Sequence, residues 1–161
     1  MRLPIRLLAG LLALDELVVG AWNQFWPESF YTHFPTVDLT PPYSEHYARD
    51  FGGATLGIAA VLLVAVIAPR GITALTAGLA FTAFGIPHLV FHAGHLAHAS
   101  GAEAVFLTVA NGIAALLGVL LLVLGVLRMG RDRRLRDPAL DGPRGRRDRQ
   151  HAGGGVRGAV P

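Results

Sequence analysis

Four long apolar segments dominate this chain and limit what it can fold into. A helix that crosses a membrane needs about 20 mostly apolar residues. The segments that come close to this requirement are residues 4–23, 46–68, 71–95 and 103–127. Because 52% of the residues are hydrophobic and only 16% are charged, the composition is that of an integral membrane protein rather than a soluble domain. The sequence therefore predicts an all-α fold within the bilayer.

Short connections join the last three segments. Residues 69–71 (Pro-Arg-Gly) and residues 100–101 (Ser-Gly) are turn formers. Short turns place consecutive helices antiparallel, so we expect an up-down bundle of four transmembrane helices over residues 1–127. Irregular backbone is then confined to the ends of the bundle, where water can satisfy its polar groups.

The placement of arginine predicts the orientation. All basic residues are arginines: Arg2 and Arg6 lie at the start of the first segment, Arg70 separates the second from the third, and ten lie beyond residue 127. By the positive-inside rule both termini are cytoplasmic. Residues 128–161 are rich in Arg, Asp, Gly and Pro, so a disordered cytoplasmic tail is expected. Its first arginines are expected to bind anionic lipid, and nucleic-acid binding is disfavoured.

The connection between the first two segments, residues 24–45, is unusually rich in aromatic residues and proline. Trp and Tyr prefer the level of the lipid headgroups, and proline stiffens the backbone. Two interpretations stay open for this extracytoplasmic loop. It is either a cap folded over the outer mouth of the bundle or a plain aromatic belt.

Polar residues lie in the outer half of every segment, whereas the inner halves are almost free of them. At 1.5 Å per residue, those in the first segment lie roughly 10 to 12 Å below its outer end. Ionisable groups inside a bilayer are costly unless paired, so they normally face the bundle interior. We therefore expect one outward-opening polar pocket. Its candidate residues are Asp15, Glu16, Arg49, Asp50 and Asn111, together with the histidines His46, His88, His92 and His95.

Residues 88–98 hold four of the seven histidines. At helical geometry, His88, His92 and His95 fall within a stripe of roughly 60°. Imidazole suits Zn, Cu or Fe, so these three residues and His46 are the candidate metal ligands. Haem held between His46 and a histidine of the third segment is a second option. The chain has no cysteine, which excludes disulfides, thiolate metal sites and covalently attached haem.

Other uses of the same pocket stay open. Asp15 and Glu16 can relay protons or pair with a cationic substrate. Arg49 can instead pair with either carboxylate in a purely structural role. The leading hypothesis is an accessory membrane subunit, not an enzyme, that binds a metal ion or small ligand. The alternatives are a subunit of proton-coupled transport or quinone-linked redox chemistry, and a structural or assembly factor.

Glycines in two segments predict close helix packing, with homodimerisation as the lesser interpretation. They are Gly53 and Gly57, which form a GxxxG motif, and Gly112, Gly118 and Gly125.

The chain resembles the small four-helix bacterial membrane proteins grouped as DoxX-like, in particular actinobacterial members. The resemblance covers residues 1–127 and rests on the acidic residues of the first segment and the run from Arg49 to Gly52 that opens the second. The segment from Pro87 to His92 adds to it. It implies a four-helix fold in the bacterial inner membrane and a protein partner. The family takes its name from a quinone-linked thiosulfate-oxidising complex, and the absence of cysteine here departs from that activity.

Overall fold

The computed structural model describes residues 1–39 and 42–136. This part of the chain is helical and contains no strand, which confirms the all-α fold class. The elements are α1 (Arg2–Phe25), α2 (Pro27–His33), the 3-10 turn η1 (Val37–Leu39), α3 (Glu45–Ile67), α4 (Gly71–Gly94) and α5 (Gly101–Arg136).

Three helices, α3, α4 and α5, are long and apolar enough to cross a membrane. This finding indicates a membrane protein. Helix α1 has the same length as α4, 24 residues, but falls short because Asp15 and Glu16 interrupt its apolar run. The structure thus supports three such helices where four were expected.

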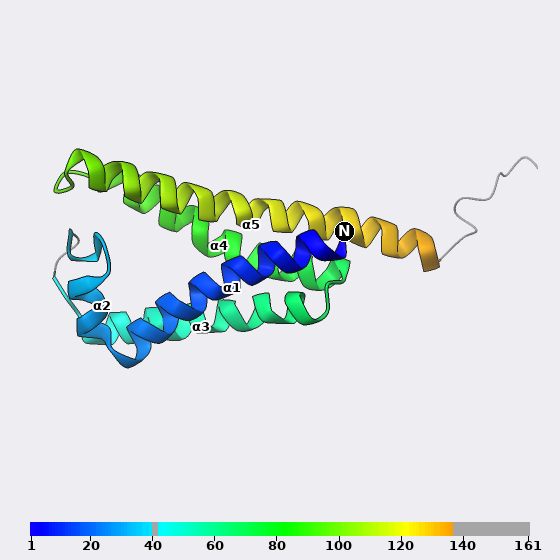
Figure 1. Ribbon diagram of the computed structural model, residues 1–161, viewed down its shortest axis with the longest axis horizontal. Coiled ribbons are helices and arrows are strands. Elements are labelled where there is room, and N and C mark those ends of the chain that lie inside the picture. Colours follow the sequence, from blue (N-terminus) through cyan, green and yellow to red (C-terminus); the bar gives the residue numbers. More distant parts are fainter. Residues whose placement is uncertain (40–41, 137–161) are drawn as a thin grey trace, which may run out of the picture.

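The long helices alternate in direction and form two pairs (Figure 1). Helix α1 packs along α3, and α4 packs along α5. The N-terminus lies at the same end of the bundle as the α3–α4 turn, while α2 lies at the opposite end (Figure 1). We call these the N-terminal end and the cap end. The two pairs make fewer contacts with each other than the helices make within each pair.

A dry core fills the part of the bundle toward the N-terminal end. Half of its ten buried residues are alanines and the other half are larger apolar side chains, and they come from all four long helices. They are Ile5, Ala9, Leu12, Ala13, Leu62, Ala65, Ala74, Ala77, Phe81 and Leu121. Small side chains let helix backbones approach closely, which is how helices associate in lipid. Phe81 is the core residue of α4 closest to the cap end, and beyond it the four helices pack less closely.

Glycines set the distance between α4 and α5. A Cβ on Gly78 would collide with the backbone of Leu122, and one on Gly125 would collide with the backbone of Leu75. Only glycine allows this approach at both crossing points. A Cβ on Gly118 would meet the Phe81 ring at 2.6 Å. The packing predicted for Gly118 and Gly125 is therefore confirmed, and Gly78 completes it.

The close packing predicted for the GxxxG motif of α3 does not occur within the chain, whereas homodimerisation through this motif stays a prediction. A Cβ on Gly57 would have no neighbour within 4 Å, and one on Gly53 would meet only the Gln24 side chain, at 3.6 Å. The same holds for Gly112, where nothing lies within 4 Å. The neighbouring Gly52 makes the close contact instead, since a Cβ there would lie 2.6 Å from the backbone nitrogen of Gln24. The face of α3 that packs on α1 is therefore the one that holds Gly52, and not the one that holds Gly53.

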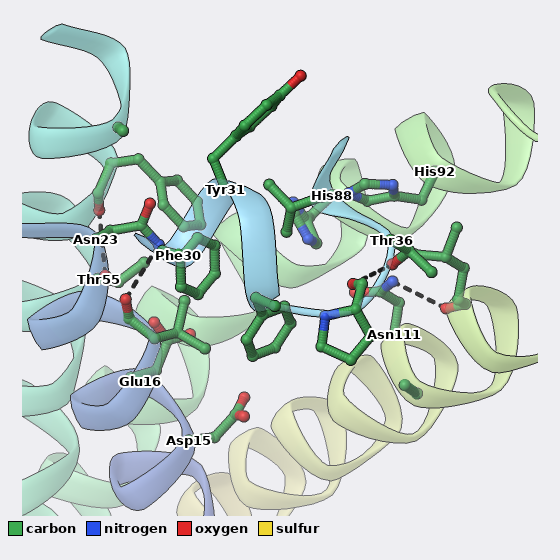
Figure 2. Close-up of a pocket in the computed structure, with 18 of the residues that line it drawn as sticks. Asp15, Glu16, Asn23, Phe30, Tyr31, Thr36, Thr55, His88, His92 and Asn111 are labelled. Atoms are coloured by element: carbon green, nitrogen blue, oxygen red, sulfur yellow. Dashed lines mark hydrogen bonds between the residues drawn. The ribbon is translucent and has the colours of Figure 1, made fainter. Parts of the chain in front are cut away.

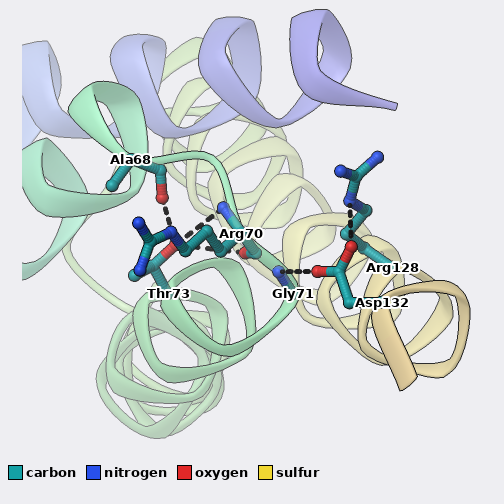
Figure 3. A network of polar contacts seen from close by, with 6 residues as sticks. All are labelled: Ala68, Arg70, Gly71, Thr73, Arg128 and Asp132. Carbon is teal, nitrogen blue, oxygen red and sulfur yellow. Dashed lines mark hydrogen bonds and ion pairs between the residues drawn. The ribbon is translucent and has the colours of Figure 1, made fainter. Parts of the chain in front are cut away.

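The N-terminal end is closed by polar contacts between α5 and the α3–α4 turn (Figure 3). Asp132 pairs with Arg128 on the same helix, with 3.0 Å between Nε and Oδ1. The same carboxylate accepts the backbone N–H of Gly71 at 3.1 Å. Within the turn, the Thr73 hydroxyl accepts the backbone N–H of Arg70 at 3.1 Å.

These contacts correct one prediction about the tail. Helix α5 continues to Arg136, so residues 128–136 are helical and not disordered as expected. The charged side chains of Arg128 and Asp132 give this extension a specific contact with the rest of the fold. The remainder of the expected tail, residues 137–161, lies outside the described residues.

Candidate functional site

A cavity of about 450 Å³ lies between the four long helices toward the cap end. This volume is within the usual range for small-molecule sites. Helices α1, α3, α4 and α5 all contribute side chains to its wall, and α2 with the loop after it closes one side. The cavity begins where the apolar core ends, since Phe81 belongs to that core and also lines the cavity.

Five of the nine predicted site residues line this cavity. They are Asp15 and Glu16 of α1, His88 and His92 of α4, and Asn111 of α5 (Figure 2). The residues that do not line it are His46, Arg49, Asp50 and His95. The cavity thus brings together the four residues placed deepest by counting along each helix, and of those placed near the outer surface it includes only His92.

Glu16 is the most unusual residue of the site. Its side chain is only 3% exposed, and its Oε2 atom has no hydrogen-bond partner in the described part of the chain. The polar neighbours Asn23 and Thr55 donate to backbone carbonyls of their own helices instead, at 3.1 Å for Asn23 to Val19 and 3.0 Å for Thr55 to Gly52. Buried carboxyl oxygens are normally paired, so an unpartnered oxygen on a residue that lines a cavity requires an explanation.

Asp15 lies beside Glu16 on the wall of the cavity and is exposed in the isolated chain. Successive residues of a helix point about 100° apart, so both side chains can face one space only if that space is wide. Figure 2 shows both carboxyl groups on the α1 side of the cavity. They give this wall its acidic character.

The two histidines of the site belong to an aromatic wall on α4. The rings of His88 and His92 lie edge to face with centroids 4.5 Å apart. His88 also stacks on Phe84 at 5.0 Å and on Phe51 of α3 at 6.3 Å. These contacts fix the plane of the His88 ring. Asn111 completes the polar lining from α5, where its amide donates to the Leu107 carbonyl at 2.8 Å.

The four candidate metal ligands are not brought together. His46 pairs with Asp50 at 3.3 Å on the exposed first turn of α3. The ring of His95 stacks on Phe91 at 4.1 Å, and its Nδ1 lies 2.7 Å from the Phe91 carbonyl oxygen. Among the residues that the structure describes, no group of three or more His, Asp or Glu side chains could hold a metal ion.

The residues expected to bind haem between α3 and α4 are not brought together either. His46 lies on the outside of the bundle with a side chain 80% exposed, so it does not face the cavity that His88 and His92 line. An axial ligand has to point at the iron from the opposite wall. The expected pairing of His46 with an α4 histidine across haem is therefore not the arrangement of this fold.

Arg49 joins two helices rather than entering the cavity. Its Nη1 donates to the backbone carbonyl of Gln24 at 2.5 Å, and its Nη2 pairs with Glu45 at 2.8 Å. The first contact satisfies a carbonyl at the C-terminal end of α1, which has no intrahelical partner. Pairing of Arg49 with Asp15 or Glu16, as the structural interpretation required, does not occur.

The loop after α1 closes the site as a cap, which we define as residues 27–39 and 42–44. Phe30 is 5% exposed and stacks on Phe34 at 4.6 Å. Trp22 meets Phe30 edge to face at 5.6 Å, and its indole N–H donates to Ser29 at 3.2 Å. Aromatic residues of this loop therefore pack on α1 and form one wall of the cavity.

The cap contains one strained residue. Thr36 has φ = 72°, the left-handed region that β-branched residues rarely adopt. Its hydroxyl donates to the carbonyl of Pro35, and Thr36 lines the cavity (Figure 2). Such strain costs roughly 1–3 kcal/mol and persists where the surroundings impose it, often at ligand-binding sites.

Sequence reasoning missed the aromatic part of the site. Phe81 and Phe84 line the cavity together with His88 and His92. The spacing of these four residues is three or four, which places them on one face of α4. This periodicity was visible in the sequence. By contrast, nothing in the sequence singled out Thr55 of α3.

Comparisons with protein-family models, with curated proteins and with solved structures each gave no match. The resemblance to DoxX-like proteins therefore stays a prediction, and the function has to be argued from the cavity itself.

Proposed function

We propose that the cavity is a binding site for a small organic molecule with an apolar body, and that the protein is a membrane-embedded ligand-binding or accessory subunit. The observation that carries this proposal is a cavity of about 450 Å³ whose wall includes Glu16, a buried residue with an unpartnered carboxyl oxygen. A small molecule fits better than a metal ion, because His88 and His92 supply only two of the ligands that a stable site needs.

We further propose that α1 is the fourth transmembrane helix. It packs along α3, and its acidic pair lines the cavity, where a polar group is less costly than in lipid. Arg6 supports this arrangement, since its Nε donates to the Val66 carbonyl at the N-terminal end of the bundle.

The positive-inside rule then orients the protein in the bacterial inner membrane, with both termini cytoplasmic and the cap outside. Arginines at positions 2, 6, 70, 128 and 131 lie toward the N-terminal end of the bundle, where anionic headgroups can meet them. The cavity then opens toward the outer leaflet. An accessory role calls for a protein partner or a second copy of the chain.

The experiment uses three fluorescent probes that share one aromatic body: neutral naphthalene, cationic 1-naphthylmethylamine and anionic 1-naphthoate. Binding to the detergent-purified full chain is measured by equilibrium dialysis against protein-free micelles. Two variants fill the cavity from different helices, Ala48→Phe on α3 and Ala110→Phe on α5. Ala60→Phe is the matched control, because Ala60 is exposed and lies outside the cavity wall.

We expect at least one probe to bind saturably, with one molecule per chain, to the wild type and to Ala60→Phe. Both filled variants should lose this binding while keeping their helical circular dichroism. Absence of saturable binding for all three probes, or equal binding to the filled variants, would contradict the proposed site.

A further inference from the structure

Among the described residues, the cavity wall carries two carboxyl groups, those of Asp15 and Glu16, and no arginine. Arg49, the nearest arginine in α3, is held by Glu45 and the Gln24 carbonyl. An anionic ligand would therefore meet two carboxyl groups without a compensating positive charge. Electrostatics favours a ligand that brings the positive charge with it.

Glu16 is placed to receive such a charge. Glu16 is 3% exposed and lines the cavity, and its Oε2 has no hydrogen-bond partner among the described residues. A buried carboxylate without a partner is costly, and a hydrogen-bonded cation removes most of that cost. The side chains of Asn23 on α1 and Thr55 on α3 donate to backbone carbonyls and not to Glu16. A ligand in the cavity can supply the donor that Glu16 lacks.

The remaining wall suits the organic part of a cation. Aromatic faces attract ammonium groups and also pack against apolar bodies. The aromatic residues of the wall come from the cap and from α3, α4 and α5. They are Phe30, Tyr31, Phe34, Tyr43, Tyr47, Phe51, Phe81, Phe84 and Phe106. His88, His92 and Asn111 add hydrogen-bonding groups on the α4 and α5 walls.

An inorganic cation fits this wall poorly. Hard cations such as Ca²⁺ require six or more oxygen ligands, and transition metals require three or four well-placed donors. The described residues contain no such group, whereas an organic ammonium ion needs only one carboxylate and an aromatic surround.

We propose that the cavity selects an organic cation, an amine or ammonium group on an apolar body, and that Glu16 is its counter-ion. This proposal rests on the proposed function and specifies the class of ligand. The cationic group lies against the α1 wall, and the apolar body lies between the cap and the aromatic wall of α4.

The test compares the three naphthalene probes on the full chain in detergent. For the wild type we expect 1-naphthylmethylamine to bind about tenfold or more tightly than both naphthalene and 1-naphthoate, the contribution of one hydrogen bond to a charged group. Glu16→Gln keeps the shape of the side chain but removes its charge, so the cation should lose this advantage. Naphthalene affinity should stay within about twofold, which shows that the cavity of the variant is intact.

Glu28→Gln is the matched control, because Glu28 lies on the exposed side of α2 outside the cavity wall and should leave the cation preference unchanged. A wild-type preference for naphthalene or 1-naphthoate, or a cation preference that survives in Glu16→Gln, would overturn the inference. If the preferred probe binds the wild type but not Ala48→Phe and Ala110→Phe, the proposed binding site stands and only the proposed class of ligand is wrong. If no probe binds saturably, the site itself is refuted.

Discussion

The Asp132 carboxylate accepts the backbone N–H of Gly71 at 3.1 Å, which ties the end of α5 to the first residue of α4. The two residues are 61 positions apart in the sequence. An acceptor at a helix N-terminus satisfies an orphan N–H group and also complements the helix dipole. The Asp132 side chain, which comes from α5, therefore caps the N-terminus of α4.

Replacing this carboxylate should weaken the fold. For Asp132→Ala we expect a loss of about 1 kcal/mol in the free energy of unfolding, since the contact is partly solvated. Unfolding in mixed detergent and SDS, followed by circular dichroism, measures the change. Arg131→Ala is the control on the same helix, because Arg131 is exposed and its side chain forms no hydrogen bond or ion pair within the described residues. Equal effects of the two substitutions would show that Asp132 has no specific role.

Gly78→Ala should separate α4 from α5. The new Cβ would collide with the backbone of Leu122, which cannot move without shifting the helix. Overpacking of this kind costs roughly 1–3 kcal/mol. Gly57→Ala is the matched change, with no atom within 4 Å of the new methyl group, and should alter stability by less than about 0.5 kcal/mol. The same unfolding assay ranks them, and the opposite order would contradict the packing described for α4 and α5.

Glu16→Met should stabilise the ligand-free protein. The substitution keeps the length of the side chain and removes a buried carboxyl group whose Oε2 has no partner. We expect a gain of roughly 1–3 kcal/mol, the usual cost of burying an unpaired polar group. Glu28→Met, at an exposed position, should change stability by less than about 0.5 kcal/mol. Destabilisation by Glu16→Met would mean that the carboxyl group supports the fold itself.

Arg49→Ala separates a structural role from a binding role. Loss of the contacts with Gln24 and Glu45 should lower stability by about 1 kcal/mol, because both are partly exposed. The affinity for the bound naphthalene probe should stay within about twofold, since Arg49 does not line the cavity. A larger loss of affinity with unchanged stability would place Arg49 in the site after all.

The proposed topology can be tested with single cysteines, because the chain has none of its own. We expect a membrane-impermeant maleimide to label Glu28→Cys in intact cells. Arg2→Cys and Arg131→Cys should react only after permeabilisation, because the positive-inside rule places both on the cytoplasmic side. Labelling of Arg2→Cys in intact cells, with Arg131→Cys still protected, would show that α1 does not cross the membrane.

Much of this arrangement could be predicted from local sequence. Apolar length and turn residues predicted the helices and their alternating direction, because both are properties of short stretches of chain. Counting along each helix also placed Glu16, His88 and Asn111 at similar depth, and these residues do line one cavity. The prediction that a disordered tail starts at residue 128 was wrong, because Asp132 contacts Gly71 of α4 and no local pattern in the sequence reveals that contact.

Depth along a helix follows from 1.5 Å per residue and is therefore a property of the sequence alone. Rotation about the helix axis is decided by the neighbouring helices, and there the predictions failed. Gly52 rather than Gly53 faces α1, Arg49 bonds to Gln24 rather than to a carboxylate of α1, and His46 points outward to Asp50. By itself the sequence determined which polar groups lie at which level of the bundle. Only the tertiary structure decided which of them share a cavity, because side-chain direction depends on how the helices pack.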